Sequence, residues 1–449
     1  MIELKDGKEC KDCKIFTDNV EGEALETVKA LCDQPEFKGS KIRCMPDIHQ
    51  GKGIVIGFTA PAGDYVNPDH IGCDIGCTVS AMFFITRLDP SMYREFERRV
   101  SKAIPQGIRI HETSQVDLKD LLAHLRNALE KAYQTSGGLT KIIPMNSRED
   151  LEAWTRSVGM DLGMFLKSLG TLGGGNHYME YDIGAFVQCF SVHTGSRNLG
   201  LKVWKKWSDH ASGRKIDKDV KRKITEEVKA LNTDRTKLKD EIWQAIEDYK
   251  ATQHPGYLSG EDLSAYLTDM VIAQAYAKYN HHVILKKVEK IHQDLTGYRD
   301  PAVQVIQTTH NYLDFDSSPM MIRKGAVSAK EGEQFILPFN MRDGIAWCEG
   351  LGNPDWNYSA PHGAGRIMSR EKAKETLNMT DFLDDMKDVC TYSVVPATID
   401  ESPRAYKSRE EIIKLIEPTC KVLFLLKPVI NIKATEEVQD AWRKKKKRD

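Results

Sequence analysis

The sequence predicts a mixed α+β fold, with a core of β-sheets, surrounding helices and a helical insertion. Two observations predict it. Short apolar runs bounded by Gly, Pro and Asp, which are typical of strands joined by tight loops, occur in both halves of the chain. Between them lies a long charge-rich stretch with few glycines, where apolar residues recur at helical spacing.

The first strand-rich segment extends from Lys41 to Ile85. Its apolar runs, Ile54 to Ala60 and Val79 to Ile85, alternate with Gly, Pro and Asp clusters and predict strands joined by loops. Loops of this kind often hold the groups that carry chemistry. From Val116 to Tyr133 the spacing of five leucines predicts an amphipathic helix with these residues in the core: Leu118, Leu121, Leu122, Leu125 and Leu129.

Residues 201–293 form the predicted helical insertion, with helical patterns from Val220 to Tyr249 and from Leu263 to Val288. The last residues, 434–449, form a basic tail that we expect to be disordered, because like charges repel. An arm that attracts phosphate is the alternative. Between the insertion and the tail, three further strand-like runs are separated by glycine-rich loops: Val303 to Thr308, Gln334 to Leu337 and Val422 to Ile432.

Charge and cysteine usage limit the class of protein. Lys and Arg number 64 and Asp and Glu 65, so any binding to nucleic acid needs a local basic surface. Ten scattered cysteines are typical of a reducing compartment. Because no apolar run is long enough to cross a bilayer, we expect a soluble, cytoplasmic protein without a membrane partner.

Five short segments combine metal-binding or phosphate-binding side chains with small neighbours that let a backbone approach a ligand closely. Each is a weak signal alone, and together they define the candidate site. They are Asp74 to Cys77, Gly173 to His177, His193 to Arg197, Thr309 to Asn311 and Pro361 to Arg366.

The candidate metal ligands come from four of these segments. The carboxylate of Asp74 and the thiolate of Cys77 can turn toward one divalent cation, although an N-cap aspartate and a buried cysteine are the commoner explanation of such a pair alone. His177, His193 and His310 raise the number of ligands above what one tetrahedral zinc ion needs. We therefore predict two metal ions that share Cys77, an arrangement suited to phosphoryl transfer. Manganese fits these ligands better than magnesium, and zinc and iron remain open.

His362 precedes Gly363, Ala364 and Gly365, small residues whose backbone N–H groups are free to meet phosphate oxygens. A neutral imidazole at this place can attack an α-phosphate. The alternative is a tight turn beside an exposed histidine, because short glycine motifs often match by chance.

Together with Met45 to Gly53, Ala405 to Lys407 and Pro428 to Lys433, these motifs resemble one family over most of the chain, the RtcB-type RNA ligases, of which this sequence looks like a divergent branch. The resemblance implies an RtcB-like fold in which residues 1–449 form a single catalytic domain. It also implies a GTP-dependent enzyme with two Mn²⁺ ions, which acts in RNA repair or transfer-RNA splicing. Such an enzyme joins RNA 2′,3′-cyclic-phosphate or 3′-phosphate ends to 5′-hydroxyl ends through a histidine–GMP intermediate, and an archease-type activator is a further implied partner.

The resemblance further implies roles for individual residues. Asp74, Cys77, His177, His193 and His310 would bind the metals. His362 would carry GMP, with Arg197 near the reacting phosphates, and Tyr406 and Lys433 would hold the guanine. The complete set of implied nucleotide contacts is Asn176, Glu180, Asn311, Asn340, His362, Gly363, Ala364, Gly365, Tyr406 and Lys433.

Two positions depart from the family pattern, and one pair of cysteines is additional to it. Asn340 stands where the family commonly has a serine that contacts GMP, and His281 stands where it has an arginine after Asn280. Cys10 and Cys13 are additional, and their spacing suits zinc but lacks a second cysteine pair.

Two other functions fit the same ligands. A two-metal phosphoesterase or nuclease would use them to activate water without GTP. A silent RNA-binding paralogue would have lost the chemistry, but retention of so many costly polar groups argues against it. A covalent GMP adduct, formed with GTP and manganese, distinguishes the ligase from both.

Overall fold

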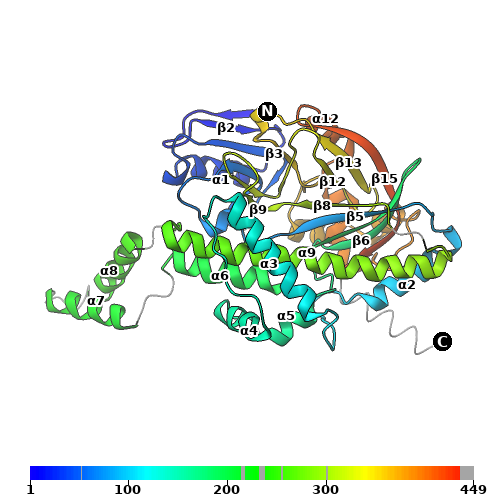
Figure 1. Ribbon diagram of the computed structural model, residues 1–449. Coiled ribbons are helices and arrows are strands. Elements are labelled where there is room, and N and C mark those ends of the chain that lie inside the picture. Colours follow the sequence, from blue (N-terminus) through cyan, green and yellow to red (C-terminus); the bar gives the residue numbers. More distant parts are fainter. Residues whose placement is uncertain (52, 214–217, 232–237, 254–255, 300–301, 435–449) are drawn as a thin grey trace.

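The computed structural model describes residues 1–51, 53–213, 218–231, 238–253, 256–299 and 302–434 (Figure 1). Strands and helices alternate along this part of the chain, and the strands form sheets of six, seven and two strands. The predicted α+β class is therefore confirmed. The predicted basic tail, apart from Ala434, lies outside the described residues.

The seven-stranded sheet holds the candidate site, and each neighbouring pair of its strands is antiparallel. Its strands include all the predicted runs after residue 300 and the run that begins at Val79. In spatial order they are β12 (Gln334–Pro338), β13 (Ile345–Gly350), β15 (Cys420–Lys433), β6 (Tyr178–Ile183), β7 (Gln188–Thr194), β5 (Thr78–Phe84) and β8 (Gln304–Thr309).

The six-stranded sheet is built mainly from the N-terminal part of the chain, and its second and third strands are parallel. Its order is β1 (Ile2–Leu4), β2 (Asp12–Ile15), β3 (Lys41–His49), β4 (Ile56–Pro61), β10 (Met321–Lys324) and β9 (Asn311–Asp314). A separate pair, β11 (Ala326–Ser328) and β14 (Ser359–Pro361), leads into His362.

The helix predicted from the leucine spacing is α3 (Leu118–Thr135), which begins after the N-cap Asp117. Leu121, Leu122, Leu125 and Leu129 are buried, and Leu118 is half-buried. The prediction of a helix with a leucine core is confirmed.

The longest helix is α9 (Gly260–Thr296), which is buried along most of its length. It packs against α2 (Tyr93–Ala103), α3 and α6 (Asn198–Ala211) and against strands β5 and β7. In contrast, α7 (Lys218–Leu231) and α8 (Leu238–Gln253) pack on each other and project from the body of the molecule (Figure 1). The charge-rich segment therefore supplies both a projecting helical pair and a central helix.

The remaining helices are short: α1 (Gly22–Cys32) and α12 (Arg409–Ile416) pack against strands, α4 (Arg148–Ser157) and α5 (Leu162–Ser168) pack on each other, and α10 (Arg370–Thr376) and α11 (Met379–Asp385) pack on the segment Pro396–Glu401. Short 3₁₀ turns occur at Pro35–Phe37, Pro68–His70, Pro90–Met92, Pro354–Trp356, Pro396–Glu401 and Pro403–Ala405. None of the helices in the described part of the chain has the length and apolar character that crossing a bilayer requires.

Candidate metal centre and adjoining cleft

At one end of the seven-stranded sheet, a single residue of β5 pairs with both neighbouring strands. Thr78, the first residue of β5, pairs with Thr194 of β7 on one side and with Thr309 of β8 on the other. Cys77 directly precedes Thr78, and His310 directly follows Thr309. The antiparallel register therefore places residues far apart in the sequence at the same end of the sheet.

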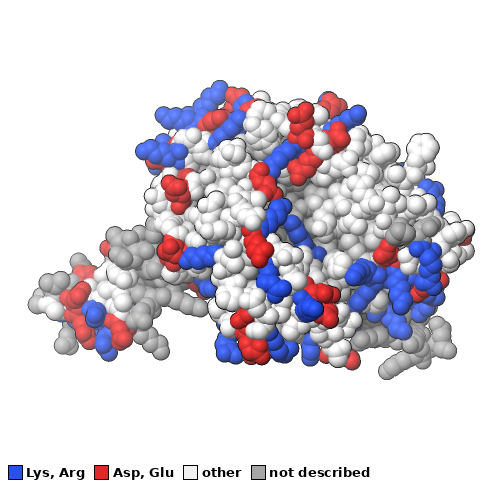
Figure 2. Space-filling model, in the orientation of Figure 1, with Lys and Arg blue, Asp and Glu red and all other residues white. Residues whose placement is uncertain are grey.

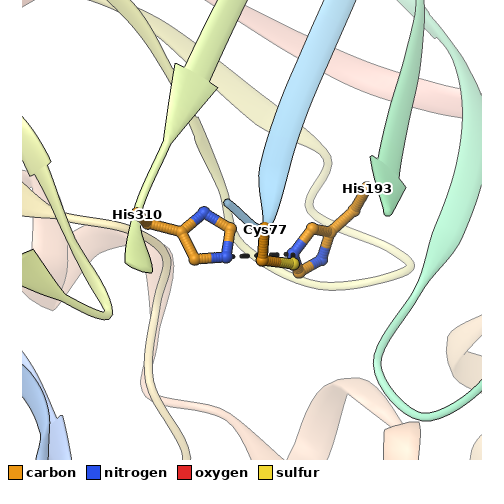
Figure 3. Close-up of side chains that lie close together, drawn as sticks. All are labelled: Cys77, His193 and His310. Carbon is orange, nitrogen blue, oxygen red and sulfur yellow. Dashed lines mark hydrogen bonds between the residues drawn. The ribbon is translucent and has the colours of Figure 1, made fainter. Parts of the chain in front are cut away.

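The side chains of Cys77, His193 and His310 converge at this end (Figure 3). The Nε2 atom of His193 lies 3.2 Å from the sulfur of Cys77 and 3.2 Å from Nε2 of His310. Two nitrogen atoms that each lie about 2.1 Å from one cation are themselves separated by roughly 3.2 Å when the angle at the metal is near 100°. Among the described residues, this is the one group of three or more His, Cys, Asp or Glu with all ligand atoms within 4.8 Å of one another.

His177 adds a fourth donor beside this group. It directly precedes β6, and its Nε2 lies 3.8 Å from the sulfur of Cys77. Its Nδ1 lies 2.8 Å from the carbonyl oxygen of Leu172. Because a carbonyl only accepts, Nδ1 carries the proton and Nε2 presents its lone pair to the site, which is how outer contacts commonly orient metal-binding histidines.

Burial keeps these imidazoles neutral. It lowers the pKa of His177 to about 3, with the positive charge of Arg197 as the next cause. Burial, followed by the neighbouring imidazoles, lowers the pKa of His193 and His310 well below the usual value. Burial and the Asp74 carboxylate raise the pKa of the Cys77 thiol, so a thiolate here needs a cation beside it. The thiol and imidazole donors therefore fit a transition-metal ion.

Asp74, the fifth predicted ligand, is not part of this group. Its side chain is exposed, and its backbone carbonyl accepts hydrogen bonds from the backbone N–H of Cys77 at 3.1 Å and from Nδ2 of Asn311 at 3.2 Å. The structure thus brings four of the five predicted metal ligands together and places Asp74 on the turn that leads into Cys77.

His362 is held by a carboxylate that the sequence did not single out. Its Nδ1 lies 2.6 Å from Oδ2 of Asp47, a fully buried residue of β3, and its backbone N–H donates to the same oxygen at 3.2 Å. The ring centroid of His362 lies 4.9 Å from that of His310. A carboxylate fixed to Nδ1 leaves Nε2 as the free nitrogen of the ring.

A cleft adjoins the metal group and encloses about 530 Å³ of space, its mouth included. His193 and His362 lie in its wall, so the candidate metal ligands and the candidate nucleophile share one cavity. Seven further residues predicted to contact a nucleotide also line it: Asn176, Glu180, Asn340, Gly363, Ala364, Tyr406 and Lys433. The same wall contains Tyr178, Phe339, Met341 and Glu401, which sequence reasoning missed.

Glu401 organises one end of this cleft. Its carboxylate lies 2.5 Å from Nζ of Lys433, accepts a hydrogen bond from the Tyr406 hydroxyl at 2.8 Å and also contacts Arg370. Burial opposes ionisation of Glu401, but Lys433 and Arg370 outweigh it and lower its pKa to about 2. No motif in the sequence indicated this residue, because its charged partners Arg370 and Lys433 are more than 30 positions away.

Asn340 occupies the altered family position without leaving an unpaired group in the cleft. Its Nδ2 donates to the Asp343 carboxylate at 2.7 Å, and its Oδ1 accepts from the backbone N–H groups of Arg342 and Asp343. The asparagine therefore fixes its own turn. His281, the other altered position, is buried, and its Nε2 lies 3.0 Å from the carbonyl oxygen of Thr194 at the end of β7.

Outside the predicted metal ligands, three predicted site residues do not line the cleft. Arg197 donates to the Thr171 hydroxyl at 2.9 Å and to the Gly107 carbonyl at 3.0 Å, and so fixes the loop before His177. The Oδ1 atom of Asn311 accepts from the backbone N–H of Gly325 at 2.8 Å.

Gly365, the third of them, has a φ of +73°. A Cβ atom there would lie 2.5 Å from the carbonyl oxygen of Asp47. A glycine is therefore needed for the loop after His362 to pack on β3.

These features define an α+β protein with a candidate transition-metal centre, beside which a carboxylate-paired histidine faces a cleft of nucleotide size. The chain belongs to the RtcB family, because the family model described as tRNA-splicing ligase RtcB matches residues 34–434.

The chain is also similar over most of its length to curated relatives. It is 28% identical over 443 residues to the RNA-splicing ligase RtcB of Escherichia coli strain K12, which covers 92% of this chain and 95% of the relative. It is 24% identical over 426 residues to the RNA-splicing ligase RtcB of Mycobacterium tuberculosis strain H37Rv, with 82% and 91% covered. It is 24% identical over 451 residues to the tRNA-splicing ligase RtcB of Aeropyrum pernix, with 87% and 86% covered.

Proposed function

We propose that this protein is a GTP-dependent RNA ligase that joins RNA 2′,3′-cyclic-phosphate or 3′-phosphate ends to 5′-hydroxyl ends, and that His362 carries GMP between the steps. Family membership supports RNA ligation. The observation that carries the chemical detail is the position of His362, which is bound to Asp47 through Nδ1 and stands between the metal group and the cleft.

The metal centre in this proposal uses Cys77, His177, His193 and His310, with Asp74 as the outer ligand. These residues would hold two Mn²⁺ ions that share the Cys77 thiolate. Bound ions of this kind neutralise the charge of phosphoryl oxygens. The neutral imidazoles fit this use because each presents a lone pair at the same end of the sheet. The buried thiol of Cys77 fits it because loss of its proton gives a thiolate at that end.

The first step forms the histidine–GMP bond. The Nε2 lone pair of His362 attacks the α-phosphorus of GTP, the bond from that phosphorus to the bridging oxygen breaks, and pyrophosphate leaves. The Asp47 carboxylate stabilises the positive charge that develops on the ring. The buried carboxylate thus acts on the nucleophile without touching the nucleotide.

The later steps transfer GMP to RNA and then release it. Water opens the cyclic phosphate where one is present. An oxygen of the RNA 3′-phosphate then attacks the α-phosphorus, and the bond to Nε2 breaks. Finally, the 5′-hydroxyl loses its proton and attacks the activated 3′-phosphorus, and GMP departs. Each step transfers a phosphoryl group beside the residues that would hold the metal ions, and bound ions would neutralise the charge on its oxygens.

A local basic surface supports RNA as the substrate. The whole chain has a formal net charge of −1, so contacts with RNA phosphates need such a surface. Lys and Arg side chains gather over α2 and the C-terminal part of α9, at the lower right of Figure 2. We refer to this surface as the α2–α9 basic surface. The exposed or half-exposed Lys and Arg residues of α2 and of the C-terminal part of α9 are Arg94, Arg98, Arg99, Lys102, Lys286, Lys287 and Lys290.

Labelling and sealing assays test the proposal. With α-labelled GTP and Mn²⁺ the wild-type protein should become covalently labelled, and it should seal 3′-phosphate or cyclic-phosphate RNA to 5′-hydroxyl RNA. His362→Ala should abolish both, whereas His282→Ala, a control at an exposed histidine of α9, should retain them. RNA shortening without GTP would show a phosphoesterase instead, and equal labelling of His362→Ala would disprove the nucleophile assignment.

A further inference from the structure

The N-terminal part of the fold gathers four cysteines that the proposed ligation does not use. They are Cys10 before β2, Cys13 in β2, Cys32 at the end of α1 and Cys44 in β3, and each is at most 1% exposed. All four belong to one buried cluster. The family match begins at residue 34, so the first three lie outside it.

Cys32 supplies the partner that the Cys10 and Cys13 pair lacks in the sequence. Its thiol is a hydrogen-bonding neighbour of both Cys10 and Cys13. The backbone fixes this arrangement, because the carbonyl of Cys32 accepts hydrogen bonds from the N–H groups of Glu9 at 3.1 Å and Cys10 at 2.9 Å. Residues 22 positions apart along the chain are therefore held together.

Cys44 lies on the same face of the sheet as Cys13. Strands β2 and β3 are parallel, and Cys13 pairs with Ile42 while Ile15 pairs with Cys44. Because side chains alternate between the two faces of a sheet, Cys13 and Cys44 point to one side. Helix α1, which ends at Cys32, packs against β3, and its buried residues belong to the same cluster.

The sulfur of Cys10 also has the surroundings of a metal-bound thiolate. The backbone N–H groups of Asp12 and Ile42 face it, and Asp12 is the second residue after Cys10. Such groups donate to a negative sulfur and compensate its charge in a buried place. In the thiol form, Cys10 donates instead to the carbonyl of Ser40 at 3.1 Å.

We propose that Cys10, Cys13, Cys32 and Cys44 bind one Zn²⁺ ion as a structural four-thiolate site. Binding releases four thiol protons to solvent and changes no oxidation state. Sulfur ligands about 2.3 Å from a tetrahedral zinc lie roughly 3.8 Å from one another. The thiols form an open chain with Cys32 between Cys10 and Cys13, so the outer side chains rotate toward the common centre on binding, and Cys10 gives up its bond to Ser40.

The site would fasten β2 and α1 onto β3, the strand that carries Asp47. Three separate elements, of which β2 and β3 are already joined by backbone pairing and the Arg43–Asp12 ion pair, would then share one ion. A structural zinc adds its binding free energy to the folded state, because the unfolded chain holds no such arrangement. The zinc is therefore expected to stabilise the element that orients His362 without entering the cleft.

Metal content tests this inference independently of ligation. The full-length Cys77→Ala/His310→Ala variant lacks the other metal group, and after expression with added zinc it should retain about one zinc per chain by mass spectrometry of the purified protein. Adding Cys10→Ser and Cys13→Ser should remove at least nine-tenths of that zinc. Adding Cys348→Ser and Cys420→Ser, a matched pair of neighbouring cysteines outside the cluster, should leave it in place.

A second measurement avoids variants that fail to fold. Cobalt-substituted Cys77→Ala/His310→Ala protein should show the intense thiolate-to-cobalt absorption of a tetrahedral sulfur site, and Cys32→Ser or Cys44→Ser alone should weaken it. Absence of zinc from the Cys77→Ala/His310→Ala protein would overturn the inference. So would an intact mass that lacks two hydrogens because Cys32 is in a disulfide with Cys10 or Cys13.

Discussion

The Nδ1 atom of His362 lies 2.6 Å from a carboxylate oxygen of Asp47, which is fully buried in β3. This contact joins the six-stranded sheet to the loop that carries the candidate nucleophile. It fixes the ring and the position of its proton, and it leaves Nε2 directed away from the carboxylate.

Asp47→Asn should therefore slow formation of the GMP adduct strongly. An amide of the same size keeps the packing but no longer stabilises the charged ring, and losses of about 10²- to 10⁴-fold are typical of such changes. The rate of GTP labelling under single-turnover conditions measures the effect, and the affinity for GTP should change little. A labelling rate within a factor of two of wild type would show that Asp47 does not position His362.

Cys77→Ala should lower manganese content and GTP labelling together. The Cys77 sulfur lies 3.2 Å from His193 and 3.8 Å from His177, so its removal takes away the donor that faces both. Equilibrium binding of Mn²⁺ with a parallel labelling assay checks the prediction, with Cys189→Ser, another buried cysteine, as the control. Unchanged metal stoichiometry would disprove the sharing of Cys77 between two ions.

The metal-free protein should lose stability as the pH falls below neutrality. Burial lowers the pKa of His49 to about 4 and that of His177 to about 3. In the unfolded chain both groups have a pKa of about 6.5, so below that pH the unfolded state binds protons that the folded state does not.

Each of these histidines then lowers the free energy of unfolding by up to about 1.4 kcal/mol per pH unit, and the loss extends from roughly pH 6.5 down to the folded pKa. His193 and His310 act in the same direction. Urea unfolding at a series of pH values measures the slope. The slope should decrease in a His49→Gln variant, and a free energy that is constant between about pH 7 and 5 would contradict the assignment of buried neutral histidines.

Charge reversal on the α2–α9 basic surface should weaken RNA binding but not GTP labelling. Lys102 and Lys290 are exposed and lie outside the cleft. If both contact phosphates, replacing them with Ala should reduce the slope of log K against log salt by about 1.5, and replacement with Glu should reduce affinity further. Retention of RNA on a filter at several salt concentrations gives the slope, and an unchanged slope would place the RNA elsewhere.

Glu401→Ala should destabilise the fold by about 3 kcal/mol or more, because it leaves buried Lys433 without its counter-charge. Glu401→Gln, which keeps the size and an acceptor for Tyr406, should cost less. Chemical unfolding of the two variants gives the difference, and equal stability of Glu401→Ala and wild type would refute the role of this ion pair.

The sequence predicted those parts of the fold that follow from local patterns. The spacing of Leu121, Leu125 and Leu129 identified α3, and apolar runs located β5, β8, β12 and β15 within a few residues. The members of the candidate metal group were recognisable as residue types in short polar segments, but the register of β5, β7 and β8 brings them together. Local pattern suffices where neighbours in sequence are neighbours in space.

Other parts of the site depend on contacts between distant segments and could not be predicted in this way. Asp47 and His362 are 315 positions apart, and Glu401 contacts Arg370 and Lys433 only after three separate segments meet. The same holds for Arg197, whose guanidinium donates to the Thr171 hydroxyl and the Gly107 carbonyl and does not line the cleft. Such pairings are set by strand register, which no single segment specifies.

The pairing of Thr78 with both Thr194 and Thr309 has a consequence for biosynthesis. At a translation rate of about 5 to 20 residues per second, His310 leaves the ribosome roughly 10 to 50 s after Cys77. During that interval the candidate metal group lacks His310, and β8 has yet to join β5. A chain that ends before residue 310 therefore lacks both the last residue of the candidate metal group and the strand that pairs with β5 on its second side.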